Sequence, residues 1–401
     1  MTMKWIAGGV TAAAGFQAAG VSAGIKRSRK PDLALIVADR PVPAAAVLTK
    51  NRVQAAPVLI TKDRLRKGSA QAIVINSGCA NCLTGEAGLQ DALTLTSRVA
   101  RELTTTDGNV LVASTGLIGR RLPLPRMLRA IPTLVKHLSR ANHTDAAQAI
   151  LTTDLQVKEA AVQSTMDGRI CRVGGMAKGA GMIAPSMATM LCVVTTDVTI
   201  APEFLRALLQ HAVTGTFNRI SVDGDMSTND TVFALASGCA GVTIRRGTKE
   251  ANTFSAMLTA VTGRLARSIV QDGEGAAKLM VIDVVGARND REAQACARQI
   301  ANSPLVKTML AGGDPNVGRI AAAAGASSAR FDPAKLEIAI GPTTLVVRGV
   351  ALNSDTAAVR KLLSRDEVNV RVHLHAGRGR GRMLSCDLTE EYVQINAGYA
   401  T

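Results

Sequence analysis

The sequence predicts a layered α/β protein. Segments with a strand pattern alternate with segments of helical periodicity along nearly all of the 401 residues. Hydrophobic residues make up 47% of the chain and charged residues 19%, so a large core can form. Aromatic residues make up only 2%, which predicts an aliphatic core. No Pro- or Ser-rich linker divides the chain, so we expect its halves to fold as one interlocked unit.

The first half of the chain predicts strands followed by polar turns. Strand patterns cover residues 33–38, 72–76 and 110–113, and helical periodicity covers residues 88–103 and 125–138. The turns Asn76-Ser77-Gly78 and Ser114-Thr115-Gly116 each follow a strand directly. Backbone N–H groups can converge on an anion at such turns.

In the second half, a strand is expected from residue 189 to 198. Residues 227–230 provide a helix cap, so the apolar run at 231–236 is expected to be helical. His373 and His375 alternate along a strand, which places both rings on one face. The Gly/Arg tract at 377–382 separates two strand patterns and predicts a solvated hairpin loop. The remaining expected helices are 202–213, 251–270 and 291–310, and the remaining strands are 279–285, 336–340, 344–350 and 368–374.

The charge of the chain raises one alternative class of function. Lys and Arg number 47 against 31 Asp and Glu, which gives a formal net charge of +16. Such a charge attracts nucleic acids, membranes and anionic metabolites. However, the scarcity of aromatic residues leaves no stacking platform for single strands, and no recognition module is evident. We therefore predict no nucleic-acid partner. A basic nucleic-acid-binding protein is kept only as an alternative to this prediction.

The cysteine and histidine patterns predict neither disulfides nor a metal site. The seven cysteines are scattered, and the Cys79-Ala-Asn-Cys82 pair lacks a second pair at metal-ligand spacing. Among the five histidines, His373 and His375 share one face of a strand, but no carboxylate partner lies in the local pattern. We expect no metal and no other cofactor.

The N-terminal residues 5–25 are apolar and uncharged, as in a signal peptide, but they are Gly/Ala-rich and lack a Leu-rich centre. No run of 18 strongly apolar residues predicts a membrane span. The expectation is a soluble cytoplasmic protein without a membrane partner.

The central segment 178–191 (KGAGMIAPSMATML) carries the most specific chemistry. Gly179 and Gly181 permit sharp bends, and a β-branched strand begins at Thr189. If the Ala188–Thr189 bond breaks, Thr189 gains an α-amine beside its own hydroxyl. That amine has a pKa of about 8 and can act as general base to the hydroxyl. The alternative is that Thr189 stands at this position only because threonine favours β-strands.

An ordered set of motifs resembles the ornithine acetyltransferase family of arginine biosynthesis, also called bifunctional glutamate N-acetyltransferase. The resemblance covers almost the whole chain. As departures, Val317 stands where the family usually has an aromatic residue, and the Gly/Arg tract at 377–382 and the high pI are also unusual. The motifs are residues 8–12, 15–16, 18–24, 51–57, 76–81, 114–116, 152–154, the central segment, 225–230, 272–275, 314–316 and 392–401.

The resemblance implies an N-terminal-nucleophile-like fold that cleaves itself between Ala188 and Thr189. Residues 1–188 become an α chain and residues 189–401 a β chain, which stay together as an α2β2 heterotetramer. Thr189 would take the acetyl group from N-acetylornithine, release ornithine and pass the acetyl group to glutamate. Whether acetyl-CoA is a further donor stays open.

The resemblance also implies roles for individual residues. The Thr115 hydroxyl and the Gly116 N–H would form the oxyanion hole. The implied substrate-binding residues are Thr152, Lys178, Thr189, Glu274, Asn396 and Thr401. Lys178 suits a substrate carboxylate, and Glu274 suits the ornithine side-chain ammonium. Against these readings, residues 114–116 could be a plain turn, and Lys178 and Glu274 could be solvated surface charges.

Two other reactions are compatible with the same motifs. A self-processing amidase or aminopeptidase would release the acyl group to water. A secondary-metabolism acyltransferase would pass it to a different amine.

Overall fold

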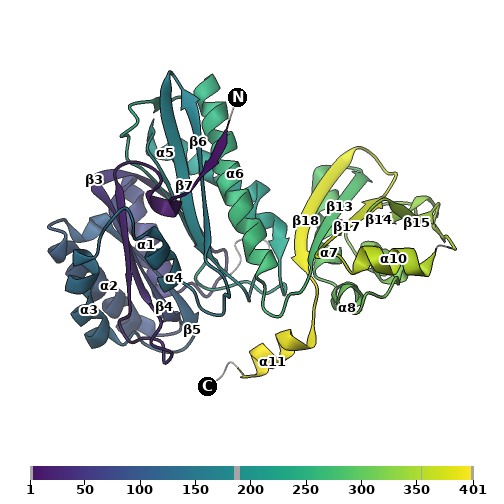
Figure 1. Cartoon of the computed structure of the whole chain (residues 1–401), viewed down its shortest axis with the longest axis horizontal. Coiled ribbons are helices and arrows are strands. Elements are labelled where there is room, and N and C mark those ends of the chain that lie inside the picture. Colours follow the sequence, from purple (N-terminus) through teal and green to yellow (C-terminus); the bar gives the residue numbers. More distant parts are fainter. Residues whose placement is uncertain (1–2, 185–189, 354, 399–401) are drawn as a thin grey trace. The chain divides into compact units, whose positions relative to one another are not determined.

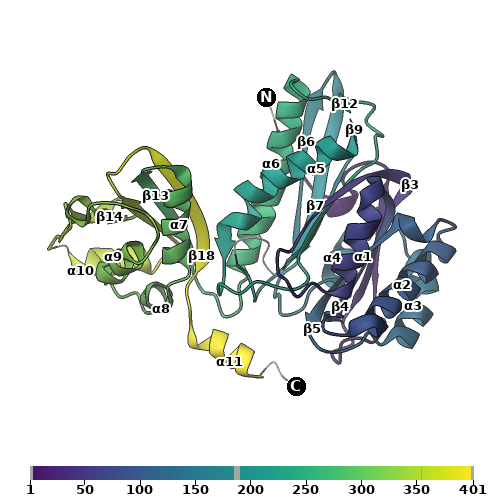
Figure 2. The same ribbon diagram turned by 180° about the vertical axis from the view of Figure 1, so that it is seen from behind.

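The computed structural model describes residues 3–184, 190–353 and 355–398 (Figures 1 and 2). The chain divides into two compact units. Unit 1 comprises Met1–Gly179, Ser186–Asn218 and Met226–Ile269. Unit 2 comprises Ala180–Pro185, Arg219–Asp225 and Val270–Thr401. The layered α/β fold class that the sequence predicts is confirmed.

Unit 1 is built on a nine-stranded sheet in which β2 pairs with β3 beside the path β1-β6-β7-β8-β11-β3-β4-β5. Strands β8 and β11, which follow residue 189, therefore lie between β7 and β3, which precede it. The strands are β1 (Lys4–Ile6), β2 (Phe16–Val21), β3 (Leu33–Leu48), β4 (Ser69–Cys79), β5 (Val110–Leu117), β6 (Lys158–Met166), β7 (Arg169–Lys178), β8 (Leu191–Thr196) and β11 (Thr231–Ala236). Two short strands, β9 (Thr199–Ile200) and β12 (Thr243–Ile244), pair separately.

Strand β3 connects the two parts of this sheet. Its register shifts between Val37 and Val42, so its first part pairs with β2 and β4 and its last part with β11. One apolar cluster joins side chains from both parts, including Ile36, Ile73 and Phe233. Aliphatic residues thus supply nearly all of this core, as the composition predicts.

Helices pack against the unit 1 sheet. Helices α2 and α3 pack together on the face formed by Leu35 and Val74 (Figures 1 and 2). Helix α5 packs on β3, and Val261 and Leu265 of α6 lie against Gly175 of β7. The helices are α1 (Ala56–Arg64), α2 (Gly85–Glu102), α3 (Leu124–Lys136), α4 (His143–Ala149), α5 (Pro202–Gly215) and α6 (Lys249–Gln271).

Unit 2 contains a seven-stranded sheet in the order β10-β18-β13-β17-β14-β15-β16. Its core joins Met280, Ile282 and Val284 of β13 to apolar side chains of helices α7–α10. The strands are β10 (Ile220–Ser221), β13 (Leu279–Ala287), β14 (Glu337–Ile340), β15 (Thr343–Val347), β16 (Val350–Ala351), β17 (Glu367–His373) and β18 (Gly379–Cys386). The helices are α7 (Asp290–Ala301), α8 (Pro304–Gly312), α9 (Val317–Gly325), α10 (Thr356–Leu363) and α11 (Glu390–Gly398).

Three sequence predictions of elements are wrong. The run at 231–236 is strand β11, because β3 and β8 pair with it on both edges. The predicted helix 291–310 is two helices, since the Ser303 side chain caps α8 and Pro304 begins it. The Gly/Arg tract is not all loop, because β18 begins at Gly379 and pairs with β13.

None of the helices in the described residues is both long enough and apolar enough to cross a bilayer.

Candidate active site

The adjacent ends of parallel strands β4 and β5 form a tight corner. Ser77 pairs with Thr115 and Gly78 with Gly116. Gly116 has φ +125°, and a Cβ there would lie 2.4 Å from the Gly78 carbonyl carbon. Only glycine fits this position, because both the backbone angle and the contact exclude a side chain. Thr115 is buried, and its hydroxyl has no hydrogen-bond partner among the described residues.

A buried hydrogen-bond network fixes this corner. The Ser114 hydroxyl donates to Asn76 Oδ1 at 2.6 Å, and Asn76 Nδ2 donates to the Cys79 carbonyl at 2.8 Å. Asn229 Nδ2 donates to the Ser114 carbonyl at 2.8 Å. The carbonyl immediately before Thr115 is therefore held by a residue at the start of β11.

The next residue, Asp230, holds the start of β8. Met190 N–H donates to Asp230 Oδ1 at 2.9 Å, and Thr231 N–H donates to the Met190 carbonyl at 3.2 Å. The dipeptide Asn229-Asp230 thus connects the Thr115 corner to the residue that follows Thr189. The predicted nucleophile Thr189 and the predicted cleavage residue Ala188 lie outside the described residues.

The Asp230 carboxyl group is fully buried, and its Oδ2 atom has no hydrogen-bond partner in the described structure. Burial raises the pKa of Asp230 well above its usual value, although Met190 N–H and Lys178 oppose the shift. A protonated carboxyl group accounts for this environment better than a carboxylate does.

We predict that Asp230→Asn leaves thermal stability at pH 7.5 unchanged or higher. The folded pKa exceeds the unfolded value of about 3.9, so the folded protein holds a proton that the unfolded chain has lost. Wild-type stability therefore decreases as pH rises from about 4 towards the folded pKa, and the amide removes that decrease. Thermal unfolding of both proteins across pH 5–8 tests this, and a large loss of stability in the variant at pH 7.5 would contradict it.

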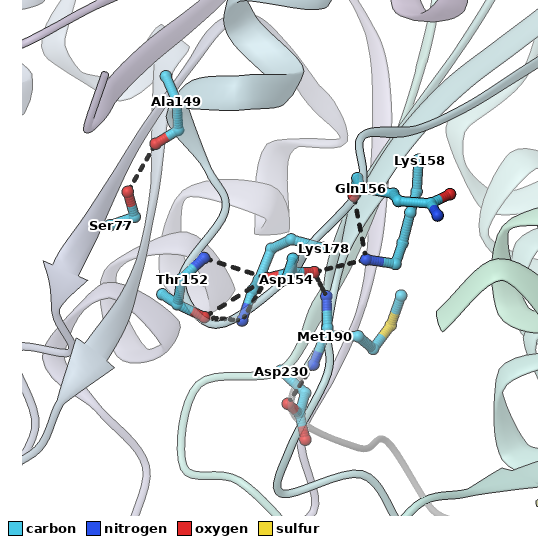
Figure 3. Close-up of polar contacts among 10 residues, drawn as sticks. Ser77, Ala149, Thr152, Asp154, Gln156, Lys158, Lys178, Met190 and Asp230 are labelled. Atoms are coloured by element: carbon cyan, nitrogen blue, oxygen red, sulfur yellow. Dashed lines mark hydrogen bonds and ion pairs between the residues drawn. The ribbon is translucent and has the colours of Figure 1, made fainter. Parts of the chain in front are cut away.

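A second polar cluster gathers at the end of β7, where Lys178 meets Thr152 (Figure 3). Lys178 Nζ donates to Thr152 Oγ1 at 2.7 Å and lies 3.7 Å from Asp154 Oδ2. Asp154 Oδ1 also accepts from Lys158 Nζ at 2.8 Å and from the Gly179 N–H at 2.7 Å. Both lysines are buried, so Lys178 is not the solvated surface charge of the alternative reading.

Burial alone would raise the pKa of Asp154, but Lys178 and Lys158 together hold it well below its usual value. Asp154 is therefore ionised, and it neutralises charge that two buried ammonium groups would otherwise carry alone. Sequence reasoning included Asp154 in a motif but assigned it no role.

We predict that Asp154→Asn lowers the free energy of unfolding at pH 7.5 by about 3–5 kcal/mol, because it leaves buried ammonium groups uncompensated. The folded pKa lies below the unfolded one, so this contribution is present above about pH 4 and is lost as pH falls through the folded value. Urea unfolding at pH 7.5 measures it. The same amide substitution at Asp230 is the control. An equal large loss in both variants would contradict the Asp230 prediction, and no loss in either would contradict the Asp154 prediction.

The two clusters lie close together within unit 1. The hydroxyl of Ser77, the strand partner of Thr115, donates to the Ala149 carbonyl at 2.6 Å, three residues before Thr152 (Figure 3). The stem of Lys26 packs on Gly78, with Cγ 3.1 Å from the position of a Cβ there. Burial and then Lys178 lower the pKa of Lys26 to about 8, although Asp32 opposes them.

Unit 2 brings together the other two described substrate-binding residues of the prediction. Asn396 Nδ2 donates to Glu274 Oε2 at 2.9 Å, and Glu274 N–H donates to the Ala180 carbonyl at 2.9 Å. A Cβ at Gly181 would lie 2.2 Å from Glu274 Oε2, so a side chain there would displace the Glu274 carboxylate from this position. The predicted residue Thr401 lies outside the described residues.

Sequence reasoning missed the two residues that hold the site together, Asn229 and Asp230, because it assigned residues 227–230 to a helix cap. Their roles depend on contacts with Ser114 and Met190, which no local sequence pattern reveals. Within the described ranges, no group of three or more His, Cys, Asp or Glu side chains could hold a metal ion.

Comparison with known proteins is consistent with the motifs. The ArgJ family model matches residues 17–401. The arginine biosynthesis bifunctional protein ArgJ of Thermosynechococcus vestitus is 46% identical, with 99% of each chain covered. The chloroplastic ArgJ protein of Citrullus lanatus is 44% identical over 99% of this chain and 89% of its own.

Among solved structures, ornithine acetyltransferase from Mycobacterium tuberculosis, complexed with ornithine, is 44% identical. It covers 46% of this chain and 99% of its own, with a TM-score of 0.44. The family model and the full-length relatives confirm the resemblance, and the chain belongs to the ArgJ family.

Proposed function

We propose that this chain is a self-processing acetyltransferase of arginine biosynthesis that moves the acetyl group of N-acetylornithine to glutamate. Family membership supports acetyl transfer in arginine biosynthesis. The observation that carries the mechanism is the Asn229-Asp230 dipeptide. Its two side chains hold the Ser114 carbonyl, before the Thr115–Gly116 corner, and the Met190 N–H, after Thr189.

The proposed self-cleavage occurs between Ala188 and Thr189. Thr189 Oγ attacks the Ala188 carbonyl carbon, the C–N bond breaks, and the hydroxyl proton ends on the new α-amine. Water then hydrolyses the resulting ester, which restores the Thr189 hydroxyl and leaves Ala188 with a carboxylate. The products are the 1–188 and 189–401 chains, and β8 and β11 remain paired with strands of the first chain.

In the transfer reaction, Thr189 Oγ attacks the acetyl carbonyl, its proton passes through the α-amine to the departing ornithine nitrogen, and an acetyl ester remains. The glutamate amine then attacks that ester, the bond between the acetyl carbon and Thr189 Oγ breaks, and the proton lost by the amine passes through the same α-amine to Thr189 Oγ, which restores the hydroxyl. The Thr115 hydroxyl and Gly116 N–H are proposed to donate to the oxyanion in both steps. Each such donor contributes about 100- to 1,000-fold in rate.

Substrate binding is proposed to use both polar clusters. Lys178, with Thr152 beside it, would bind a substrate carboxylate, and Glu274, with Asn396 and Thr401, would bind the ornithine ammonium. Acetyl-CoA as a further donor and an α2β2 assembly are parts of the same proposal.

An acetyl-transfer assay tests this function against its hydrolytic alternative. Purified protein is incubated with N-acetylornithine, with and without glutamate, and ornithine and N-acetylglutamate are quantified. We expect ornithine and N-acetylglutamate in equal amounts, and little ornithine without glutamate. Ornithine release that is independent of glutamate would instead identify an amidase. A second incubation with acetyl-CoA and glutamate measures the use of that donor.

A further inference from the structure

The Gly/Arg tract forms a strand with two different faces. Gly379 and Gly381 face α7, where a Cβ would lie 2.2 Å from the Asn289 carbonyl carbon and 2.5 Å from that of Ala293. No side chain fits between strand and helix there. Because successive residues of a strand point to opposite faces, Arg380 and Arg382 point away from the helices. Both are exposed.

Neighbouring strands add further arginine to this open face. In the sheet register, Asp283 of β13 lies opposite Arg382 of β18 on one side and Arg371 of β17 on the other. These residues line a pocket of about 830 Å³ together with Arg219, Val284, Val285, Gly286, His373, Gly377, Arg378, Arg380 and Gly381. Five arginines and one carboxylate therefore surround a single pocket.

The single carboxylate of the pocket, Asp283, already accepts hydrogen bonds from Arg382. Arg382 Nε and Nη2 donate to the two Asp283 oxygens at 2.6 and 2.8 Å. In the part of the chain that the structure describes, no carboxylate pairs with the guanidinium groups of the other four arginines, Arg219, Arg371, Arg378 and Arg380. Their donors are thus available to a ligand.

We propose that this arginine pocket is a binding site for an anion that carries several phosphate groups in one chain. Guanidinium groups bind phosphate oxygens in a bidentate manner, and four arginines without a carboxylate partner among the described residues favour a ligand that carries several negative charges. The pocket volume falls in the range of small-molecule sites. None of its lining residues is Phe, Tyr or Trp, and His373 is the one aromatic ring among them, so the pocket offers little surface on which a nucleobase would stack.

The arginines of the pocket lie on separate strands. Arg371 and Arg380 lie on β17 and β18, on either side of β13. Two strand spacings separate their backbones by about 10 Å, so a chain of several phosphate groups can contact guanidinium groups from both strands at once. The site is independent of acetyl transfer, since none of its residues belongs to the proposed catalytic or substrate-binding set.

Calorimetric titration of the full-length protein with inorganic tripolyphosphate tests the site at 150 mM salt. The test variant is Arg371→Gln with Arg380→Gln. The charge-matched control is Arg101→Gln with Arg129→Gln, two exposed arginines on α2 and α3 that do not line the pocket. We expect the test variant to bind at least about tenfold more weakly, because it loses two charge-assisted contacts. The control should bind like wild type, and acetyl transfer should be unchanged in both.

Titrations with orthophosphate and with a single-stranded oligothymidylate complete the test. Weaker binding of orthophosphate than of tripolyphosphate supports the multi-strand site. Absence of tripolyphosphate binding by the wild type, or equal weakening in both variants, would overturn the proposal. Tighter binding of the oligonucleotide than of tripolyphosphate would reassign the pocket to a nucleic-acid backbone.

Discussion

Thr189→Ala is expected to yield one uncleaved chain of 401 residues with no detectable acetyl transfer. The substitution removes the hydroxyl that the proposal requires for both peptide cleavage and acetyl-ester formation. Denaturing gels and intact-protein mass spectrometry follow the first effect, and the N-acetylornithine assay follows the second. Wild type should give two fragments, with the second beginning at Thr189.

Thr189→Ser is the matched variant, because it keeps a hydroxyl and, after cleavage, an α-amine. We expect it to be cleaved and to retain measurable transfer. Wild-type protein that remains one intact chain and still transfers acetyl would refute the self-processing mechanism, and so would a second fragment that begins at another residue.

Gly116→Ala is expected to reduce the rate of acetyl transfer by at least about 100-fold, the cost of losing one oxyanion donor. The new Cβ would lie 2.4 Å from the Gly78 carbonyl carbon, so the two strand ends must separate. That movement displaces the Gly116 N–H and the neighbouring Thr115 hydroxyl. The initial rate per folded protein, with folding verified by thermal unfolding, measures the effect.

Gly119→Ala is the control that distinguishes the steric contact of a Cβ at residue 116 from the cost of a positive φ. Gly119 also has a positive φ, +82°, but a Cβ there meets no atom within 4 Å. This variant should retain nearly wild-type transfer. Equal losses in the two variants would assign the effect to backbone strain in the β5 loop. If Gly116→Ala does not fold, Thr115→Val tests the corner alone, since it removes only the hydroxyl.

The sequence predicted those elements that are determined by residues close together in the chain. Helices α2, α3, α5 and α6 show their periodicity directly, and the strand pattern at 110–113 marks β5, although Thr115 and Gly116, predicted as a turn after it, lie within that strand. Lys178 was identified from its position in the central segment, and its burial beside Thr152 suits the role that was assigned to it.

The errors arise from contacts between residues far apart in the chain. Nothing local distinguishes the apolar run 231–236 from a buried helix; its pairing with β3 and β8 decides that it is a strand. Likewise, the roles of Asn229 and Asp230 depend on Ser114 and Met190. The glycines of the Gly/Arg tract are fixed by α7, about 90 residues earlier. The break at Ser303-Pro304, by contrast, was readable from the proline.

The interleaving of strands in unit 1 has a consequence for the order of folding and chain cleavage. Strands β8 and β11 are inserted between β7 and β3, so neither residues 1–188 nor residues 189–401 contain the complete nine-stranded sheet by themselves. If the proposed self-cleavage takes place, we expect the protein to fold as a single polypeptide before it is divided. Once divided and then denatured, it would have to reassemble two separate molecules, so processing converts a first-order folding reaction into a second-order one.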